Sequence, residues 1–80
     1  RENLNTVDSM INSNKNNYWL TDRELDVLAL MVEGLSNPQI AEKLFITRAT
    51  AKAHVHSILQ KLCASTRTQA TVVAMKEGLV

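Results

Sequence analysis

Glycine and proline are scarce in this chain of 80 residues, and their positions limit how it can fold. The glycines are Gly34 and Gly78 and the proline is Pro38, so few points break regular structure. Between these points, apolar residues recur every three or four positions, which is the period of an amphipathic helix and not of a strand. With only three aromatic residues in the chain, the pattern favours an all-α domain over a β-sandwich.

Capping and stop signals predict four helices, over about 22–33, 37–44, 48–62 and 66–77. The first helix opens with Thr21 followed by Glu24, a capping box, and Gly34 stands where a helix ends. Ser36 or Asn37 caps the second helix, and Pro38 lies in its first turn. Only about three residues separate the second helix from the third, which is the tight connection of a helix-turn-helix.

Residues 1–18 are expected to be the tail of a preceding segment, and residues 19–80 the folded domain. Within the tail, 12–17 is a polar, Asn-rich run that is typical of a linker. A short helical pattern precedes it, formed by Leu4, Val7, Met10 and Ile11. Because the chain begins at Arg1 rather than Met, we expect a longer protein with a further domain.

Size and cysteine content restrict the class of protein. A single domain of this length buries about 60% of its unfolded surface, so an enclosed substrate cavity is not expected. No apolar run approaches the roughly 20 residues that cross a bilayer, and no signal peptide is evident. Cys63 has no second cysteine to pair with, which predicts a reducing, cytoplasmic location. We interpret Cys63 as a small buried apolar residue and not as a reactive thiol.

Charge is distributed unevenly along the chain. Residues 20–42 sum to −4, whereas the stretch from 43 to 76 has six basic residues and no Asp or Glu. The six are Lys43, Arg48, Lys52, Lys61, Arg67 and Lys76. A one-sided basic surface is the electrostatic footprint of a nucleic-acid-binding protein, although an ordinary solvated surface is the alternative.

The third predicted helix has two distinct faces. Its buried stripe is Ala51, Val55, Ile58 and Leu62, and its outward face is Ala49, Lys52, Ala53, His56 and Gln60. On that face, short side chains allow close approach to a groove floor, Lys52 can donate to guanine, and Ala53 can contact a thymine methyl. The residues placed to meet phosphates are Thr47, Arg48, Thr50, Ser57 and Lys61.

Neither a catalytic nor a metal site is predicted. His54 lies beside the buried stripe, which favours a partly packed side chain. His54 and His56 are two residues apart on a helix and so do not share a face. The chain has no nucleophile, base and orienting group at workable spacing and no Gly-rich phosphate loop. We therefore expect neither an enzyme nor a bound cofactor.

Residues 20–80 resemble the LuxR-type (NarL/FixJ/GerE) helix-turn-helix domain found at the C-terminus of many bacterial response regulators and quorum-sensing activators. The resemblance covers about 60 residues in order. It rests on Leu20, Thr21, Arg23, Glu24, Val27, Leu28, Gly34, Ser36, Asn37, Ile40, Ala41, Leu44, Ile46, Thr47, Thr50, Lys52, His54, Ile58, Lys61, Leu62, Arg67, Ala70, Ala74, Gly78 and Leu79.

The resemblance implies a four-helix domain that places its third helix in the major groove of promoter DNA and acts as a dimer on paired half-sites. Base reading then falls to Ala49, Lys52, Ala53 and His56, and backbone contacts to Thr47, Arg48, Thr50 and Lys61. The fourth helix would form the dimer contact through Thr68, Val72 and Met75, unless that stripe packs into the core instead. A pair between Glu24 and Arg67 across the domain is also implied.

The further partners implied are an upstream receiver or ligand-binding domain, as in a two-component response regulator, and RNA polymerase. Two alternatives share the helix-turn-helix build: a sigma-factor-like region and a protein–protein interaction module. The interaction module agrees less well with a basic face that lacks acids, and sigma-factor recognition helices usually carry more Arg and Glu than this one.

Overall fold

The structure is a computed structural model and describes residues 18–80. That part of the chain forms α2 (Asp22–Val32), α3 (Asn37–Leu44), α4 (Arg48–Lys61) and α5 (Arg67–Lys76), with no strand. Each helix agrees with its predicted range to within one residue at either end, and the all-α class is confirmed. The predicted N-terminal helical pattern and the Asn-rich run 12–17 lie outside the described residues.

Each helix within residues 18–80 begins at a hydroxyl side chain that accepts a hydrogen bond from the backbone. The four N-cap residues are Thr21, Ser36, Thr47 and Thr66. At α2 the capping box is complete, because Thr21 N–H also donates to Glu24 Oε1 over 2.9 Å. Ser36, rather than Asn37, caps α3, and it forms a second capping box with Gln39. These bonds satisfy amide groups that a helix start would otherwise leave unpaired.

The four described helices also end in the same way. A residue with positive φ stands at each end: Gly34 (95°), Phe45 (58°), Cys63 (54°) and Gly78 (66°). The amide of the next residue then donates back to a carbonyl five positions earlier, over 2.9 to 3.1 Å, from Leu35, Ile46, Ala64 and Leu79. These four donors are apolar and pack on the core. Each helix end is therefore a Schellman motif with its hydrophobic contact.

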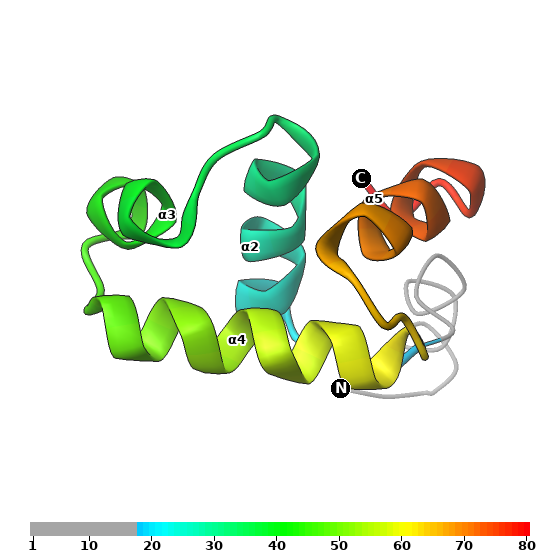
Figure 1. Ribbon diagram of the computed structural model, residues 1–80, viewed down its shortest axis with the longest axis horizontal. Coiled ribbons are helices and arrows are strands. Elements are labelled where there is room, and N and C mark those ends of the chain that lie inside the picture. The colour runs from blue at the N-terminus through cyan, green and yellow to red at the C-terminus, as the bar shows by residue number, and fades with distance from the viewer. Residues whose placement is uncertain (1–17) are drawn as a thin grey trace, which may run out of the picture.

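The long helix α4 forms one edge of the domain (Figure 1). Helix α2 stands across its middle, α3 lies over its N-terminal part and α5 over its C-terminal part (Figure 1). Helices α2, α3 and α5 all contact α4, and α2 also contacts α3 and α5. No other described helix covers the opposite side of α4, which is the lower edge in Figure 1.

One apolar core joins the four helices and fixes the rotation of α4 about its own axis. Its buried members are Leu20, Val27, Leu28, Leu30, Met31, Ile40, Ala41, Ala51, Val55, Ile58, Leu62, Ala70 and Ala74. Val27, Leu28, Ile40 and Ile58 are fully buried, and each contributes about 1.5–3 kcal/mol of transfer free energy. Within residues 18–80, no helix has the length and hydrophobicity to cross a membrane.

Candidate nucleic-acid interface

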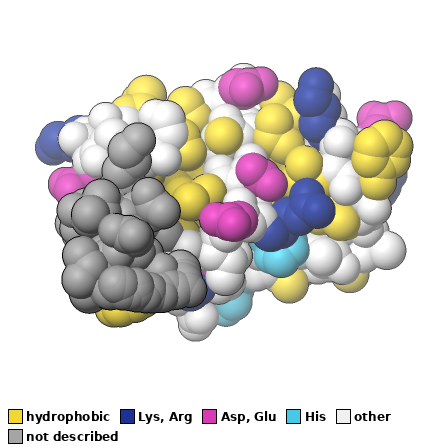
Figure 2. Space-filling model, turned by 180° about the vertical axis from the view of Figure 1, so that it is seen from behind, with side chains coloured by type: hydrophobic (Ala, Val, Ile, Leu, Met, Phe, Trp, Pro, Cys, Tyr) yellow, Lys and Arg dark blue, Asp and Glu magenta, His cyan; other side chains and the backbone are white. Residues whose placement is uncertain are grey.

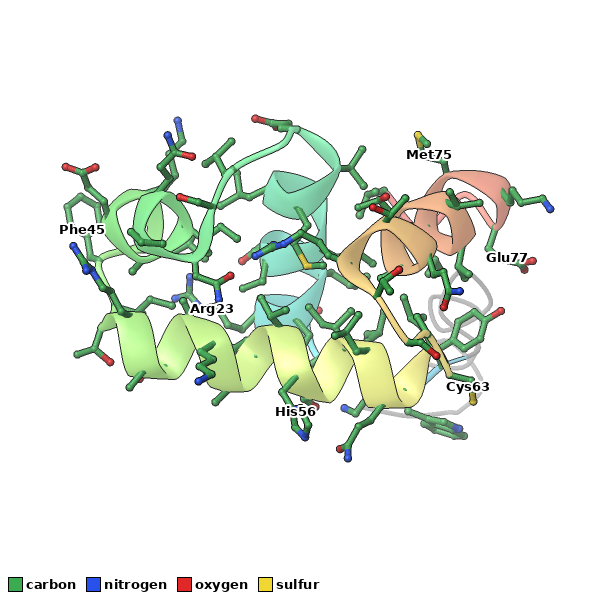
Figure 3. The ribbon with its side chains drawn as sticks, viewed as in Figure 1. Arg23, Phe45, His56, Cys63, Met75 and Glu77 are labelled. Carbon is green, nitrogen blue, oxygen red and sulfur yellow. The ribbon has the colours of Figure 1, made fainter. Side chains whose placement is uncertain are left out.

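The outward face of α4 is exposed along its first two and a half turns. Ala49, Lys52, Ala53 and His56 are all exposed, whereas Ala51, Val55 and Ile58 are buried on the other side. Figure 3 shows His56 pointing away from the other helices, into the space beyond the edge of the domain. The structure therefore brings the four predicted base-reading residues together on one uncovered surface.

Helix α4 contributes no negative charge to this edge of the domain. Helix α4 contains no Asp or Glu, and its first turn is free of acidic residues. Viewed from behind, the acidic side chains lie over the upper and middle part of the surface, while a histidine stands at its lower edge (Figure 2). An anionic ligand that approaches α4 from this side meets Lys52 and no carboxylate of that helix.

The start of α4 presents hydrogen-bond donors next to this face. The hydroxyl of Thr47 accepts from Thr50 N–H over 3.0 Å and donates to Thr50 Oγ1 over 2.9 Å. The hydroxyl hydrogen of Thr47 is thus used within the domain, whereas that of Thr50 is left for an outside acceptor. Arg48 is exposed beside them. Amide groups in the first turn of a helix add a partial positive charge that suits a phosphate.

Lys61 and Ser57, at the other end of α4, are engaged within the domain. Lys61 Nζ donates to Glu24 Oε1 over 2.7 Å and to the carbonyl of Trp19 over 2.9 Å. Ser57 Oγ donates to Glu24 Oε2 over 2.6 Å. The expectation that the Ser57 hydroxyl donates to a phosphate is therefore wrong, because its single hydrogen already goes to Glu24. The ammonium of Lys61 has three N–H donors, and two are used in these contacts, so one remains for an outside acceptor.

Glu24 is the buried centre of this group of contacts. Burial by itself would raise its pKa, but the hydrogen bonds from Lys61, Ser57 and the backbone of Thr21, together with the charge of Lys61, outweigh burial and lower the pKa to about 2. Glu24 therefore stays ionised at neutral pH although it is only 5% exposed. Its role is to tie α2 to the C-terminal half of α4.

The expected pair between Glu24 and Arg67 is wrong. Arg67 Nη2 donates instead to Asn37 Oδ1, which links the start of α5 to the start of α3. Arg67 Nη1 is buried and has no hydrogen-bond partner within residues 18–80. Lys61 holds the position beside Glu24 because α2 crosses α4, so the lysine of α4 is nearer than the arginine of α5.

The stripe on α5 faces outward and does not pack into the core. Thr68, Val72 and Met75 are exposed, the last two by 42% and 60%, while Ala70 and Ala74 fill the buried side. Figure 3 shows Met75 at the outer surface of α5. An open groove of about 300 Å³ runs beside the stripe, lined by Cys63, Ala64, Thr68, Gln69, Val72 and Val73. The expectation that Cys63 is buried is wrong, since its side chain is exposed.

Two aromatic side chains that the sequence analysis did not single out are highly exposed. Phe45 is 95% exposed and Trp19 is 83% exposed, both with positive φ. Their signal in the sequence was weak, because neither position carries the glycine or asparagine that usually marks a left-handed residue. His54 is half-buried as predicted. No cluster of three metal-binding side chains exists within the described part of the chain.

Comparisons with known proteins agree with this arrangement. The family described as bacterial regulatory proteins, luxR family, matches residues 19–74. The chain is 57% identical over 60 residues to the uncharacterized transcriptional regulatory protein YxjL of Bacillus subtilis (strain 168), which covers 75% of this chain and 28% of that protein. It is 52% identical over 61 residues to the transcriptional regulatory protein LiaR of the same organism, covering 76% and 29%.

A solved structure has the same fold. The crystal structure of the response regulator ChrA in a heme-sensing two-component system matches with a TM-score of 0.75 and 39% identity, over 90% of this chain and 36% of that one. Measured against its sequence relatives, the chain spans less than a third of the length of YxjL and of LiaR.

The family match runs from the residue before Leu20 into the last turns of α5, so it covers the helix-turn-helix and the outward face of α4. Proteins of this family are DNA-binding transcription regulators and not enzymes, which confirms the prediction that this domain has no catalytic role. The resemblance seen in the sequence is confirmed as well. The chain belongs to the luxR family of bacterial regulatory proteins.

Proposed function

We propose that residues 19–80 bind double-stranded DNA at specific promoter sequences, with α4 in the major groove. The observation that carries this proposal is the outward face of α4, which is exposed, free of acidic residues and short-chained at Ala49 and Ala53. A major groove about 12 Å wide admits one helix whose contact face lacks bulk. Helix α3 then lies over the start of α4, as the first helix of a helix-turn-helix does when it crosses the DNA backbone.

The two sets of residues have different tasks in this proposal. Ala49, Lys52, Ala53 and His56 read base edges. Thr47, Arg48, Thr50 and Lys61 position the domain on phosphates. Within the second set, Arg48 and the Thr50 hydroxyl offer side-chain donors, and Thr47 offers its backbone amide. Two contacts within the domain leave Lys61 one ammonium hydrogen for a phosphate.

Selection from a randomised duplex library, followed by paired substitutions, tests this division. Lys52→Ala should weaken specific binding by about 1–3 kcal/mol and relax one base position. Arg48→Ala should weaken binding to all sequences alike and make the salt slope shallower by about one unit. Lys76→Ala is the control, because it removes the same charge from the exposed end of α5. Identical behaviour of the Lys52 and Arg48 variants across sequences would refute the division.

The outward stripe of α5 is proposed as the contact of a homodimer formed on DNA. Thr68, Val72 and Met75 form an exposed, mainly apolar strip beside an open groove, which is a surface that a second copy can cover. Val72→Asp should leave the fold intact and abolish paired half-site binding, while binding to a single half-site persists. Sedimentation velocity with one-site and two-site duplexes measures this, and unchanged two-site assembly would remove α5 from the interface.

The domain is further proposed to be the output part of a two-component response regulator in the bacterial cytoplasm, where promoters are located. Support comes from the relatives YxjL and LiaR, because this chain matches less than a third of the length of each. Residues 1–18 would then connect it to a receiver or ligand-binding domain, and RNA polymerase would be a further partner at the promoter. Joining the chain to a candidate receiver domain and measuring DNA affinity with and without phosphorylation tests this assignment.

A further inference from the structure

The centre of the α4 face is occupied by two methyl groups. At 100° per residue, Ala49 and Ala53 lie within about 30° of the direction opposite the buried stripe of α4. Both are exposed, and neither belongs to the apolar core. Lys52 and His56 lie to one side of them. Gln60 lies further along the same face, and the longer side chains of Lys52 and His56 flank the alanines, so the two methyl groups form a shallow apolar patch between them.

An alanine methyl has one suitable partner on the floor of a major groove. The C5-methyl of thymine is the apolar group there, whereas the other base edges present hydrogen-bond donors and acceptors. An alanine pressed against such an edge would leave it unpaired, at a free-energy cost. Ala49 and Ala53 are one turn apart, about 6 Å along the helix axis, which corresponds to about two base pairs at about 3.4 Å each.

Lys52 adds a second criterion. Its ammonium has three donors and no acceptor, so it matches guanine, whose O6 and N7 both accept. Helix α4 has no carboxylate to accept from the amino group of cytosine. Ala49, Ala53 and Lys52 together are therefore suited to thymine and guanine.

We propose that the domain recognises thymine by its C5-methyl group at two positions about two base pairs apart, under Ala49 and Ala53, next to a guanine held by Lys52. This inference rests on the proposed function and goes further, because it names the chemical groups that are read. It makes the thymine methyl, and not a hydrogen bond, the main determinant at two positions of each half-site.

Base analogues test the proposal without altering the protein. In the duplex enriched by selection, each thymine is replaced singly by deoxyuridine, which removes only the methyl group. Two positions in each half-site should each lose about fourfold in affinity, the effect of one buried methyl, and the other thymines should lose nothing. Replacing the guanine by 7-deazaguanine should cost about tenfold with the unchanged protein, and nothing further with Lys52→Ala.

A substitution in the protein assigns each methyl to its alanine. Ala53→Ser should bring the preference for thymine over deoxyuridine close to one at a single position and leave the other position sensitive. Ala29→Ser makes the same change on α2 and should leave both positions sensitive, with circular dichroism confirming that both variants are folded. An enriched motif that is indifferent to loss of every methyl would overturn this inference alone. A library that yields no motif would overturn the proposed function and this inference with it.

Discussion

Replacing Glu24 by glutamine should make the stability of the domain less dependent on acid. The folded structure lowers the pKa of Glu24 from 4.5 to about 2. A shift of one unit corresponds to 1.36 kcal/mol, so the ionised carboxylate stabilises the folded state by about 3 kcal/mol relative to its protonated form. That is a large share of the roughly 5–15 kcal/mol that holds a small domain together.

The direction of the pH effect follows from the sign of the shift. Because the folded pKa is depressed, the contribution is fully present above pH 4.5, the unfolded value, and is lost as the pH falls towards the folded value of about 2. By pH 3, about 2 kcal/mol should be gone. Urea unfolding at pH 7, 5, 4 and 3 measures the contribution of the ionised carboxylate, as the difference in unfolding free energy between wild type and Glu24→Gln. That difference should shrink as the pH falls, while contributions from other carboxylates cancel.

A matched substitution separates this effect from general acid sensitivity. Glu33→Gln makes the same chemical change at an exposed position at the end of α2. This variant measures what loss of one surface carboxylate does over the same pH range. The reasoning about burial and hydrogen bonding at Glu24 would be refuted if the Glu24→Gln difference changed no more with pH than the Glu33→Gln difference, or if it grew as the pH fell.

Two further predictions concern stability alone and are measured by urea unfolding at pH 7. Ile58→Ala, at a fully buried position of α4, should lower the unfolding free energy by about 2–5 kcal/mol, and a loss below about 1 kcal/mol would contradict the described core. Phe45→Asn should raise the unfolding free energy by about 0.5–1 kcal/mol, because asparagine tolerates the left-handed conformation and Phe45, at 95% exposure, has almost no burial to lose. A destabilised asparagine variant would show that Phe45 makes contacts in the free domain.

The sequence predicted the helices well because their boundaries are coded locally. Thr21 with Glu24, and Ser36 with Gln39, are capping boxes within four residues of chain, and Gly34 ends α2 with the positive φ that glycine adopts readily. The exposed face of α4 was predictable for a similar reason. Once the buried residues of a helix are recognised from their period, the opposite face follows from geometry.

Contacts between helices were harder to predict, because they depend on which helices cross and where. The acid at Glu24 was recognisable as a structural residue, but its partner was assigned to Arg67 rather than to Lys61. The two cations are six positions apart in sequence and lie on different helices, so only the crossing of α2 and α4 decides between them. The exposure of Cys63 was missed because it follows from a left-handed residue without a glycine to mark it.

The repeated Schellman ends bear on the thermodynamics of complex formation. Connections of only three to five residues separate the helices, and each contains a left-handed residue followed by an apolar residue packed on the core. The direction of α4 is therefore set at both of its ends before any ligand arrives. If α4 docks as a rigid body, binding costs little backbone entropy. The free energy of contacts at its outward face would then contribute to affinity and sequence discrimination, because little of it is offset by the cost of ordering the helix.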